Sequence, residues 1–515
     1  MSSFAGTPIR LVLIALVAIP ALYLTFLFYL AGSTWIALGS LLLVLLFIYI
    51  YSSRRAYTYR YLFPGLFAFG LFVIFPLIYT VWISFTKYSS TNLQPFRGAL
   101  SVFRQETFLA NQDSYSYNLY RQNDGTYILY LKNEKDPNKT FISEPFELVG
   151  GKEPDPTAEP IQLKASSPDA LPAGEKLKLP QITREKLFIG MRGRKFLLPD
   201  DTLVQAETLQ LFTARERLWK FNPDGTLTNK KNGMTIHPDF KQGFFVNDKG
   251  ERIGVGFRTF AGFDNYMRIV TDPQLQGPFF RIFVWTVCFS AFSVLGTFAT
   301  GLLLATILEW KELRFRRIYR VLLILPYAVP SILSILIFKG LFNQEFGAIN
   351  EVLRGLLHFA PEWETNPWGA RAMILLVNLW LGYPYMMLIC TGMLQSIPSG
   401  IYEASAIDGS NPLVDFFKLT LPLVLPPLIP VLIASFAFNF NNFSLIFLLT
   451  AGGPRMVGGG LAGETDILVT YTYTIAFRDA GTNYSLSSTV ATILFLIVGS
   501  LAYLNLRLSG RRVKL

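Results

Sequence analysis

The chain has 515 residues, of which 51% are hydrophobic and 15% aromatic, and its formal net charge at pH 7 is +11. A mean hydropathy of +0.37, with apolar runs long enough to cross a bilayer, excludes an ordinary soluble globular protein. No helix-turn-helix, zinc-finger or base-stacking motif accompanies the positive charge, so we expect no nucleic-acid partner.

The apolar runs predict an α-helical integral membrane protein with eight transmembrane helices in the lipid bilayer. The first run follows Arg10 and is soon followed by a second, so we interpret it as a retained helix rather than a removed signal peptide. The predicted spans cover residues 11–31, 34–51, 62–85, 280–308, 320–342, 371–396, 421–449 and 485–506.

These spans predict four parts of the chain. They are an N-terminal transmembrane hairpin (1–61), a third transmembrane helix (62–86), a polar insertion (87–279) and a membrane core (280–515) with a polar loop at 397–422. The hairpin lies outside that core, so we expect it to have an accessory role.

Basic residues cluster after the second, fourth and eighth spans. By the positive-inside rule these clusters are cytoplasmic, which also places both termini and the 397–422 loop in the cytoplasm and the insertion outside. The clusters are Arg54, Arg55 and Arg60; Lys311, Arg314, Arg316, Arg317 and Arg320; and Arg507, Arg511, Arg512 and Lys514.

The insertion contains three turn signals flanked by residues that favour strands, at 123–125, 223–225 and 248–250. We therefore expect a folded, mostly β domain outside the membrane. It has no nucleophile–base pair and no convergent carboxylate pair, so a docking surface fits it better than a catalytic site.

The membrane core carries polar side chains where they are costly unless they face a cavity or another helix. On one predicted helical face lie Ser435, Phe438, Asn439 and Asn442, and Asn378, Gly382 and Tyr385 share another. Amides and aromatic rings without a charged residue suit a neutral, polyhydroxylated ligand. Alternatively, the amides only join helices.

Candidate metal ligands and nucleotide-binding motifs are absent from the sequence. Cys288 and Cys390 fall inside apolar spans, and His237 and His358 lie far apart in the sequence without ligand spacing. The chain has no G-x-x-x-x-G-K-[ST] motif, so it cannot hold ATP phosphates itself. We expect no cofactor in this chain and no enzymatic activity.

The 397–422 loop predicts two short amphipathic helices joined by an elbow. Pro398 suits the first turn of the first helix, and Asp408-Gly409 ends it. Asn411-Pro412 then reads as the N-cap and first residue of the second helix. The loop looks suited to binding another protein.

The residues E-A-S at 403–405, Gly409 and L-T-L-P at 419–422 resemble the coupling loop of binding-protein-dependent ABC importer permeases. Ser405 and Leu419 depart mildly from that pattern. The chain is similar to maltose/maltodextrin permease subunits over nearly its whole length, as in LGYPYMM (381–387) and ASFAFNFNNF (434–443).

This resemblance implies a type I ABC importer permease core and an immunoglobulin-like periplasmic insertion in a bacterial inner membrane protein. Its implied partners are a second permease subunit, an ABC ATPase dimer that binds ATP and Mg, and a periplasmic maltose-binding protein. It assigns maltose or maltodextrin contact to Asn378, Gly382, Tyr385, Ser435, Phe438, Asn439 and Asn442. It assigns ATPase coupling to Glu403, Ala404, Ile407, Asp408 and Gly409.

Two alternatives remain open. The first is an ABC permease for another neutral sugar, such as trehalose. The second is a secondary transporter, although a proton-coupled one should carry an intramembrane acid. Neither a homodimer nor a heterodimer of permease subunits is excluded by the sequence.

Overall fold

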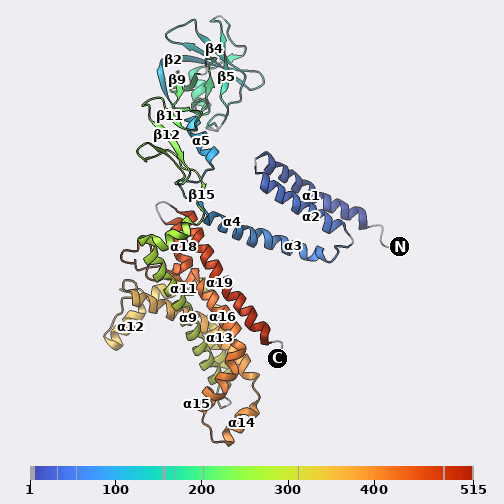
Figure 1. Ribbon diagram of the computed structural model, residues 1–515, viewed down its shortest axis with the longest axis vertical. Helices are drawn as coiled ribbons and strands as arrows, with labels where there is room; N and C mark the ends of the chain where they lie inside the picture. Colours follow the sequence, from blue (N-terminus) through green and yellow to red (C-terminus); the bar gives the residue numbers. More distant parts are fainter. Residues whose placement is uncertain are drawn as a thin grey trace.

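The computed structural model describes residues 6–31, 33–53, 55–154, 158–168, 170–200, 202–310, 312–478 and 482–512. Three residues of the predicted basic clusters, Arg54, Lys311 and Lys514, lie outside this part. The molecule is elongated, with a β-rich domain at one end and the short helices α14 (Ser399–Ile407) and α15 (Pro412–Asp415) at the other (Figure 1).

Six helices in the described part are long and apolar enough to cross a membrane, by length and composition. The helices that contain them are α1 (Gly6–Leu30), α3–η1–α4 (Tyr59–Phe69, Gly70–Ile74, Phe75–Ser84), α9 (Pro273–Glu309), α13 (Pro367–Gln395), α15–η2–α16 (η2 Phe416–Thr420, α16 Leu421–Phe440) and α19 (Tyr484–Arg512). The predicted span 34–51 coincides with α2 (Thr34–Ser52), which is apolar but shorter.

The predicted span 320–342 is not one continuous helix. Helices α10 (Arg316–Ala328) and α11 (Ser331–Leu341) meet at 92° across a short break, and the number of spans rises to seven if the pair counts as one. Pro330 disfavours helical backbone at the residue before it, and Val329 is accordingly extended with φ −87° and ψ 131°. The predicted span therefore corresponds to a helix pair that is bent at this proline.

The predicted span 421–449 is also interrupted. Helix α16 ends at Phe440, and a separate helix, α17 (Phe443–Leu449), follows. Asn442 is the N-cap of α17, and its side chain accepts a hydrogen bond from the Leu445 N–H at 3.4 Å. Asn442 therefore does not share one continuous helical face with Ser435 and Asn439. The other core helices are α12 (Ala348–Leu357) and α18 (Leu468–Phe477).

Helices α9 and α13 pack closely because glycines bring their backbones together. A Cβ added at Gly301 would lie 2.7 Å from the backbone N of Met387, and one at Gly382 would lie 2.7 Å from Cγ2 of Thr297. Buried apolar side chains, including Phe289 on α9 and Ile374 on α13, fill the space between the core helices. Helices α1 and α2 lie to one side and are connected to the core through α3 and α4 (Figure 1).

The insertion folds into two β-rich lobes on a two-stranded base, as Figure 1 shows. The base pairs β1 (Thr86–Lys87) with β15 (Thr259–Phe260). The nearer lobe is a five-stranded meander of β10 (Trp219–Phe221), β11 (Leu227–Asn229), β12 (Thr235–Asp239), β13 (Phe244–Asn247) and β14 (Arg252–Ile253), packed on α5 (Phe96–Gln105).

In the outer lobe, the strand pairing closes into a ring. The strands are paired in the order β3-β4-β5-β7-β8-β9-β2, and β2 also pairs with β3. The bounds are β2 (Thr107–Arg121), β3 (Tyr127–Asn133), β4 (Thr140–Ser143), β5 (Ile161–Ser166), β6 (Glu175–Lys176), β7 (Phe196–Leu197), β8 (Leu203–Ala206) and β9 (Leu211–Arg217), with helices α6 (Leu179–Arg184) and α7 (Leu187–Arg192).

A mostly β domain was predicted, and the three turn signals were correct: Gly125, Gly225 and Gly250 have φ of 84°, 84° and 78°. The pairing differs from the immunoglobulin-like expectation, which requires two separate facing sheets. The long strand β2 accounts for the difference, because it pairs with β9 along one part and with β3 along another.

Candidate functional site

Three asparagine side chains meet inside the membrane core. Nδ2 of Asn378 on α13 donates to Oδ1 of Asn439 on α16 at 2.7 Å, and Nδ2 of Asn442 donates to Oδ1 of Asn378 at 3.4 Å. Nδ2 of Asn439 also donates to the Ser435 carbonyl oxygen at 2.9 Å. Asn378 and Asn439 are buried, so the cluster satisfies amides that would otherwise be costly at this depth.

The two aromatic candidates are the accessible members of the predicted set. Phe438 is 70% exposed and Tyr385 is 43% exposed in the single subunit. Gly382 lies against Thr297 of α9, which gives this glycine a packing role between two helices. The structure therefore brings the amides together, leaves the rings exposed and places Gly382 at a helix contact.

The 397–422 loop forms the two predicted helices. Gly409 has φ +75°, the left-handed conformation that ends α14, and the Asn411 side chain caps α15 by accepting from the Val414 N–H at 2.9 Å. Pro398 is the N-cap residue, one position before the first turn for which it was predicted. Oδ1 of Asp415 accepts from both Ser405 and Ser410, at 2.5 and 2.6 Å, which ties the two helices together.

The loop exposes the side chains predicted to touch a partner. Glu403, Ala404, Asp408 and Gly409 are exposed, and Ile407 is 87% exposed. The loop lies at the end of the molecule opposite the β-rich domain (Figure 1).

Sequence reasoning missed an ionic contact at the other end of α13. Nη2 of Arg371 lies 2.8 Å from Oε2 of Glu464, and Nε of Arg371 donates to the Glu464 carbonyl oxygen at 3.1 Å. The Arg371 guanidinium also lies 4.9 Å from the ring centroid of Trp285 and 5.1 Å from that of Trp368. An arginine at the first position of a predicted span was the available signal.

The neighbouring Asp466 holds the loop between α17 and α18 together. Its carboxylate accepts from the Gly463 N–H and from the Thr470 hydroxyl, both at 2.8 Å, and burial raises its pKa. Gly452 lies directly against it, where a Cβ would meet the carboxylate. This network positions Glu464 for its contact with α13.

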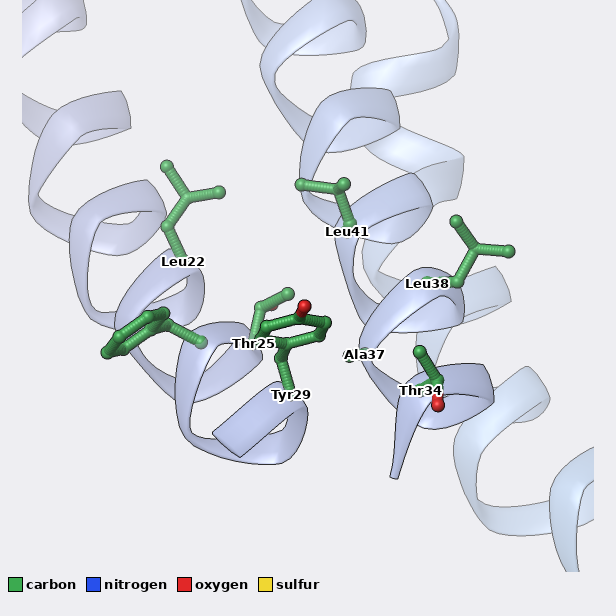
Figure 2. Close-up of a pocket in the computed structure, with 8 residues that line it drawn as sticks. Leu22, Thr25, Tyr29, Thr34, Ala37, Leu38 and Leu41 are labelled. Atoms are coloured by element: carbon green, nitrogen blue, oxygen red, sulfur yellow. The ribbon is translucent and has the colours of Figure 1, made fainter. Parts of the chain in front are cut away.

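A separate pocket of about 460 Å³ lies between α1 and α2 (Figure 2). Its lining contains no charged side chain, so it does not suit a polar solute. The lining residues are Leu22, Thr25, Phe26, Tyr29, Thr34, Ala37, Leu38 and Leu41. Among the residues that the structure describes, no group of three His, Cys, Asp or Glu side chains lies close enough to hold a metal ion.

Two protein-family models match the sequence. Residues 95–262 match the P2 domain of the maltose transport system permease protein MalF, and residues 283–515 match the binding-protein-dependent transport system inner membrane component. Together these matches cover most of the insertion and almost the whole membrane core.

The chain is also similar to curated proteins over most of its length. The maltose/maltodextrin transport system permease protein MalF of Klebsiella aerogenes is 45% identical over 493 residues, which cover 94% of this chain and 93% of that protein. MalF of Escherichia coli K12 is 43% identical with the same coverage. MalF of Yersinia pestis is 43% identical over 510 residues, or 97% of this chain and 94% of that protein.

Among solved structures, the chain resembles a crystal structure of a bacterial ABC transporter involved in the import of the acidic polysaccharide alginate. The TM-score is 0.42 at 19% identity, covering 48% of this chain and 84% of that one.

Proposed function

The chain belongs to the MalF family of maltose/maltodextrin transport permeases, and on that premise we propose that it forms part of the pathway for maltose and maltodextrins through the membrane. It is a non-catalytic permease subunit of a binding-protein-dependent ABC importer. The observation that best supports a neutral sugar as cargo is the cluster of Asn378, Asn439 and Asn442, in which no charged side chain takes part.

We assign the sugar site to Asn378, Gly382, Tyr385, Ser435, Phe438, Asn439 and Asn442. The exposed rings of Tyr385 and Phe438 provide flat apolar surfaces for the C–H face of a pyranose. The amides of Asn378 and Asn439 form a hydrogen bond with each other here. A bound sugar would break this bond and replace it with hydrogen bonds from the amides to its own hydroxyl groups. Gly382 would contribute indirectly, by holding α13 close to α9.

We assign ATPase coupling to Glu403, Ala404, Ile407, Asp408 and Gly409. In this proposal a MalK-like ATPase dimer, which binds ATP and Mg, receives α14 in a cleft on one subunit. Ile407 packs inside the cleft and Glu403 pairs with a basic residue there. Closure of the ATPase dimer then moves the core helices and switches access to the proposed sugar site between the two sides of the membrane.

The proposed topology has eight spans, counting α2 and the bent α10–α11 pair, with both termini cytoplasmic. The chain is a multi-pass protein of the bacterial inner membrane by family. The insertion at 87–279 would lie in the periplasm and dock a maltose-binding protein. A MalG-like second permease subunit would complete the pathway, while the hairpin at 1–61 would have an accessory role.

The coupling assignment is tested by Glu403→Lys in cells that supply the partner subunits. We expect loss of radiolabelled maltose uptake, with the variant still present in the membrane at the wild-type level. Full uptake by the variant would overturn the role of Glu403. Parallel uptake of labelled trehalose distinguishes the cargo, because stronger trehalose uptake would overturn the assignment of maltose.

A further inference from the structure

A polar cavity of about 340 Å³ lies where the insertion joins the membrane core. Its walls come from the segment that follows α4, from the β13–β14 hairpin, from α8 (Asp264–Thr271) and from the start of α19. The residues that matter for its chemistry are Lys87, Asn92, Arg252, Asn265, Arg268 and Ser485.

The cavity sits at the point where two candidate spans leave the membrane. Helix α4 ends at Ser84 and α19 begins at Tyr484, and the Ser485 N–H donates to the Tyr88 carbonyl oxygen at 2.9 Å. In Figure 1 the end of α4 and strand β15 lie together at this junction. We therefore expect the cavity to lie at the depth of lipid headgroups rather than of acyl chains.

Side chains around the cavity fit a membrane–water interface. Trp82, near the end of α4, is 44% exposed, and the Arg258 guanidinium lies 4.9 Å from its ring centroid. Phe263 and Met267 are 68% and 58% exposed beside the cavity-lining residues of α8. Interfacial tryptophans and exposed apolar side chains next to cations are typical of this zone.

The charge of the cavity is positive. Lys87 lies 3.8 Å from Asp264 and Arg268 lies 4.0 Å from Asp272, so each has one distant carboxylate. In the part of the chain that the structure describes, no carboxylate lies within 4.0 Å of Arg252. Its guanidinium lies 4.4 Å from the ring centroid of Phe244 and donates a long hydrogen bond of 3.4 Å to Oε1 of Gln242.

Buried hydrogen bonds hold the walls of the cavity in place, as a binding site requires. The Asn265 side-chain amide is buried and donates to the carbonyl oxygens of Ser84 and Thr86, both at 2.8 Å. The buried Asn92 amide donates to the Gly243 carbonyl oxygen at 2.7 Å. These bonds fix α8 and the β13–β14 hairpin relative to α4, and so hold Arg252 and Arg268 on the same cavity.

We propose that this cavity binds the phosphate of an anionic phospholipid from the outer leaflet of the membrane. Guanidinium groups pair with phosphate oxygens through two parallel hydrogen bonds, and basic pockets beside transmembrane helices favour anionic headgroups. Arg252 and Arg268 hold the phosphate, and the acyl chains lie along the exposed apolar side chains of α4 and Met267. Free inorganic phosphate shares the headgroup chemistry but lacks those chains.

The test uses the full permease complex, purified in mild detergent and incubated with phosphatidylglycerol, with phosphatidylethanolamine or with inorganic phosphate. Native mass spectrometry counts the lipids retained, and a thermal shift measures protection. The variant is Arg252→Gln/Arg268→Gln. The matched control is Arg184→Gln/Arg192→Gln, which removes two exposed arginines from α6 and α7 in the outer lobe.

We expect the wild type and the control to retain phosphatidylglycerol and the Arg252→Gln/Arg268→Gln variant to retain roughly tenfold less. Arg252→Lys/Arg268→Lys keeps the charge but not the paired hydrogen bonds, so it should retain more phosphatidylglycerol than the glutamine variant and less than the wild type. Equal retention by the variant and the control would overturn the site. Equal protection by inorganic phosphate, or equal retention of phosphatidylethanolamine, would overturn the anionic lipid as its ligand.

Discussion

Arg371 at the start of α13 binds Glu464 through both the side chain and the backbone of that residue, at 2.8 and 3.1 Å. Both side chains of the pair are 18% exposed. The contact fastens the loop between α17 and α18 to α13, which also carries Asn378. A movement of this loop is thereby linked mechanically to the helix that holds the amide cluster.

Arg371→Gln should destabilise the assembled complex by about 1–3 kcal/mol, because it removes a charge-assisted pair and the cation–π contacts with Trp285 and Trp368. Glu464→Gln should cost less, since the bond from Nε to the Glu464 carbonyl oxygen survives it. Thermal unfolding of the two variants gives the comparison. A larger loss of stability for Glu464→Gln than for Arg371→Gln would contradict a contribution from the hydrogen bond to the Glu464 carbonyl oxygen.

The Asn378–Asn439 hydrogen bond should show a coupling energy of roughly 0.6–2 kcal/mol in a double-mutant cycle of the two alanine variants, measured by unfolding in nanodiscs. The same variants separate the two roles left open for these amides. If Asn439 also contacts the sugar, Asn439→Ala lowers maltose uptake while the complex still assembles. Loss of assembly alone would favour the interhelical role.

Gly409→Ala should weaken coupling between ATP hydrolysis and transport. The residue has φ +75°, which costs an alanine roughly 1–2 kcal/mol, and a Cβ there meets nothing within 4 Å, so the effect is one of backbone strain alone. Asn tolerates this conformation better, and Gly409→Asn should be milder. Maltose-stimulated ATPase activity is the measurement.

Gly400→Ala is the matched control for that variant. Gly400 lies in the same loop, inside α14, and a Cβ there also meets open space. Alanine in helical backbone should stabilise α14 by up to about 1 kcal/mol and leave coupling intact. Equal damage from both substitutions would show that the loop tolerates no added methyl group, whatever its backbone conformation.

Hydropathy located the membrane helices well but could not place their breaks. Apolar residues continue on both sides of Val329, and the prolines Pro326 and Pro330 are the local signal that the helices meet at 92°. Asn442 offered a weaker signal, because asparagine is favoured at helix N-caps but does not by itself end a helix. Local composition therefore predicts that a span is present, whereas individual residues such as a proline or an N-cap determine where its helix is interrupted.

The residues of the candidate site could be selected from the sequence, but their contacts with one another could not. The helical spacing correctly grouped Ser435 with Asn439, but that Asn378 and Asn439 satisfy each other depends on how α13 and α16 pack. Arg371 and Glu464 lie 93 residues apart, and no periodic pattern connects them. Contacts of this kind depend on tertiary packing, which the local patterns of a single sequence do not predict.

Two glycines at the α9–α13 contact should respond differently to alanine. At Gly382 the added Cβ meets Cγ2 of Thr297 at 2.7 Å and the Thr297 Cβ only at 3.6 Å, so a single methyl group is the obstacle. Thr297→Ser removes that methyl group and keeps the hydroxyl, which donates to the Ser293 carbonyl oxygen at 2.7 Å. Thr297→Ser should therefore rescue Gly382→Ala.

Gly301→Ala has no such remedy, because its Cβ would meet the backbone N of Met387 at 2.7 Å and the backbone C of Met386 at 2.8 Å. We expect it to destabilise the complex by about 1–3 kcal/mol, as overpacking does, in the presence or absence of Thr297→Ser. The measurement is thermal unfolding of Gly382→Ala and Gly301→Ala, each with and without Thr297→Ser. Failure of Thr297→Ser to restore Gly382→Ala, with Gly301→Ala tolerated, would mean that α9 and α13 separate readily and that neither glycine sets their distance.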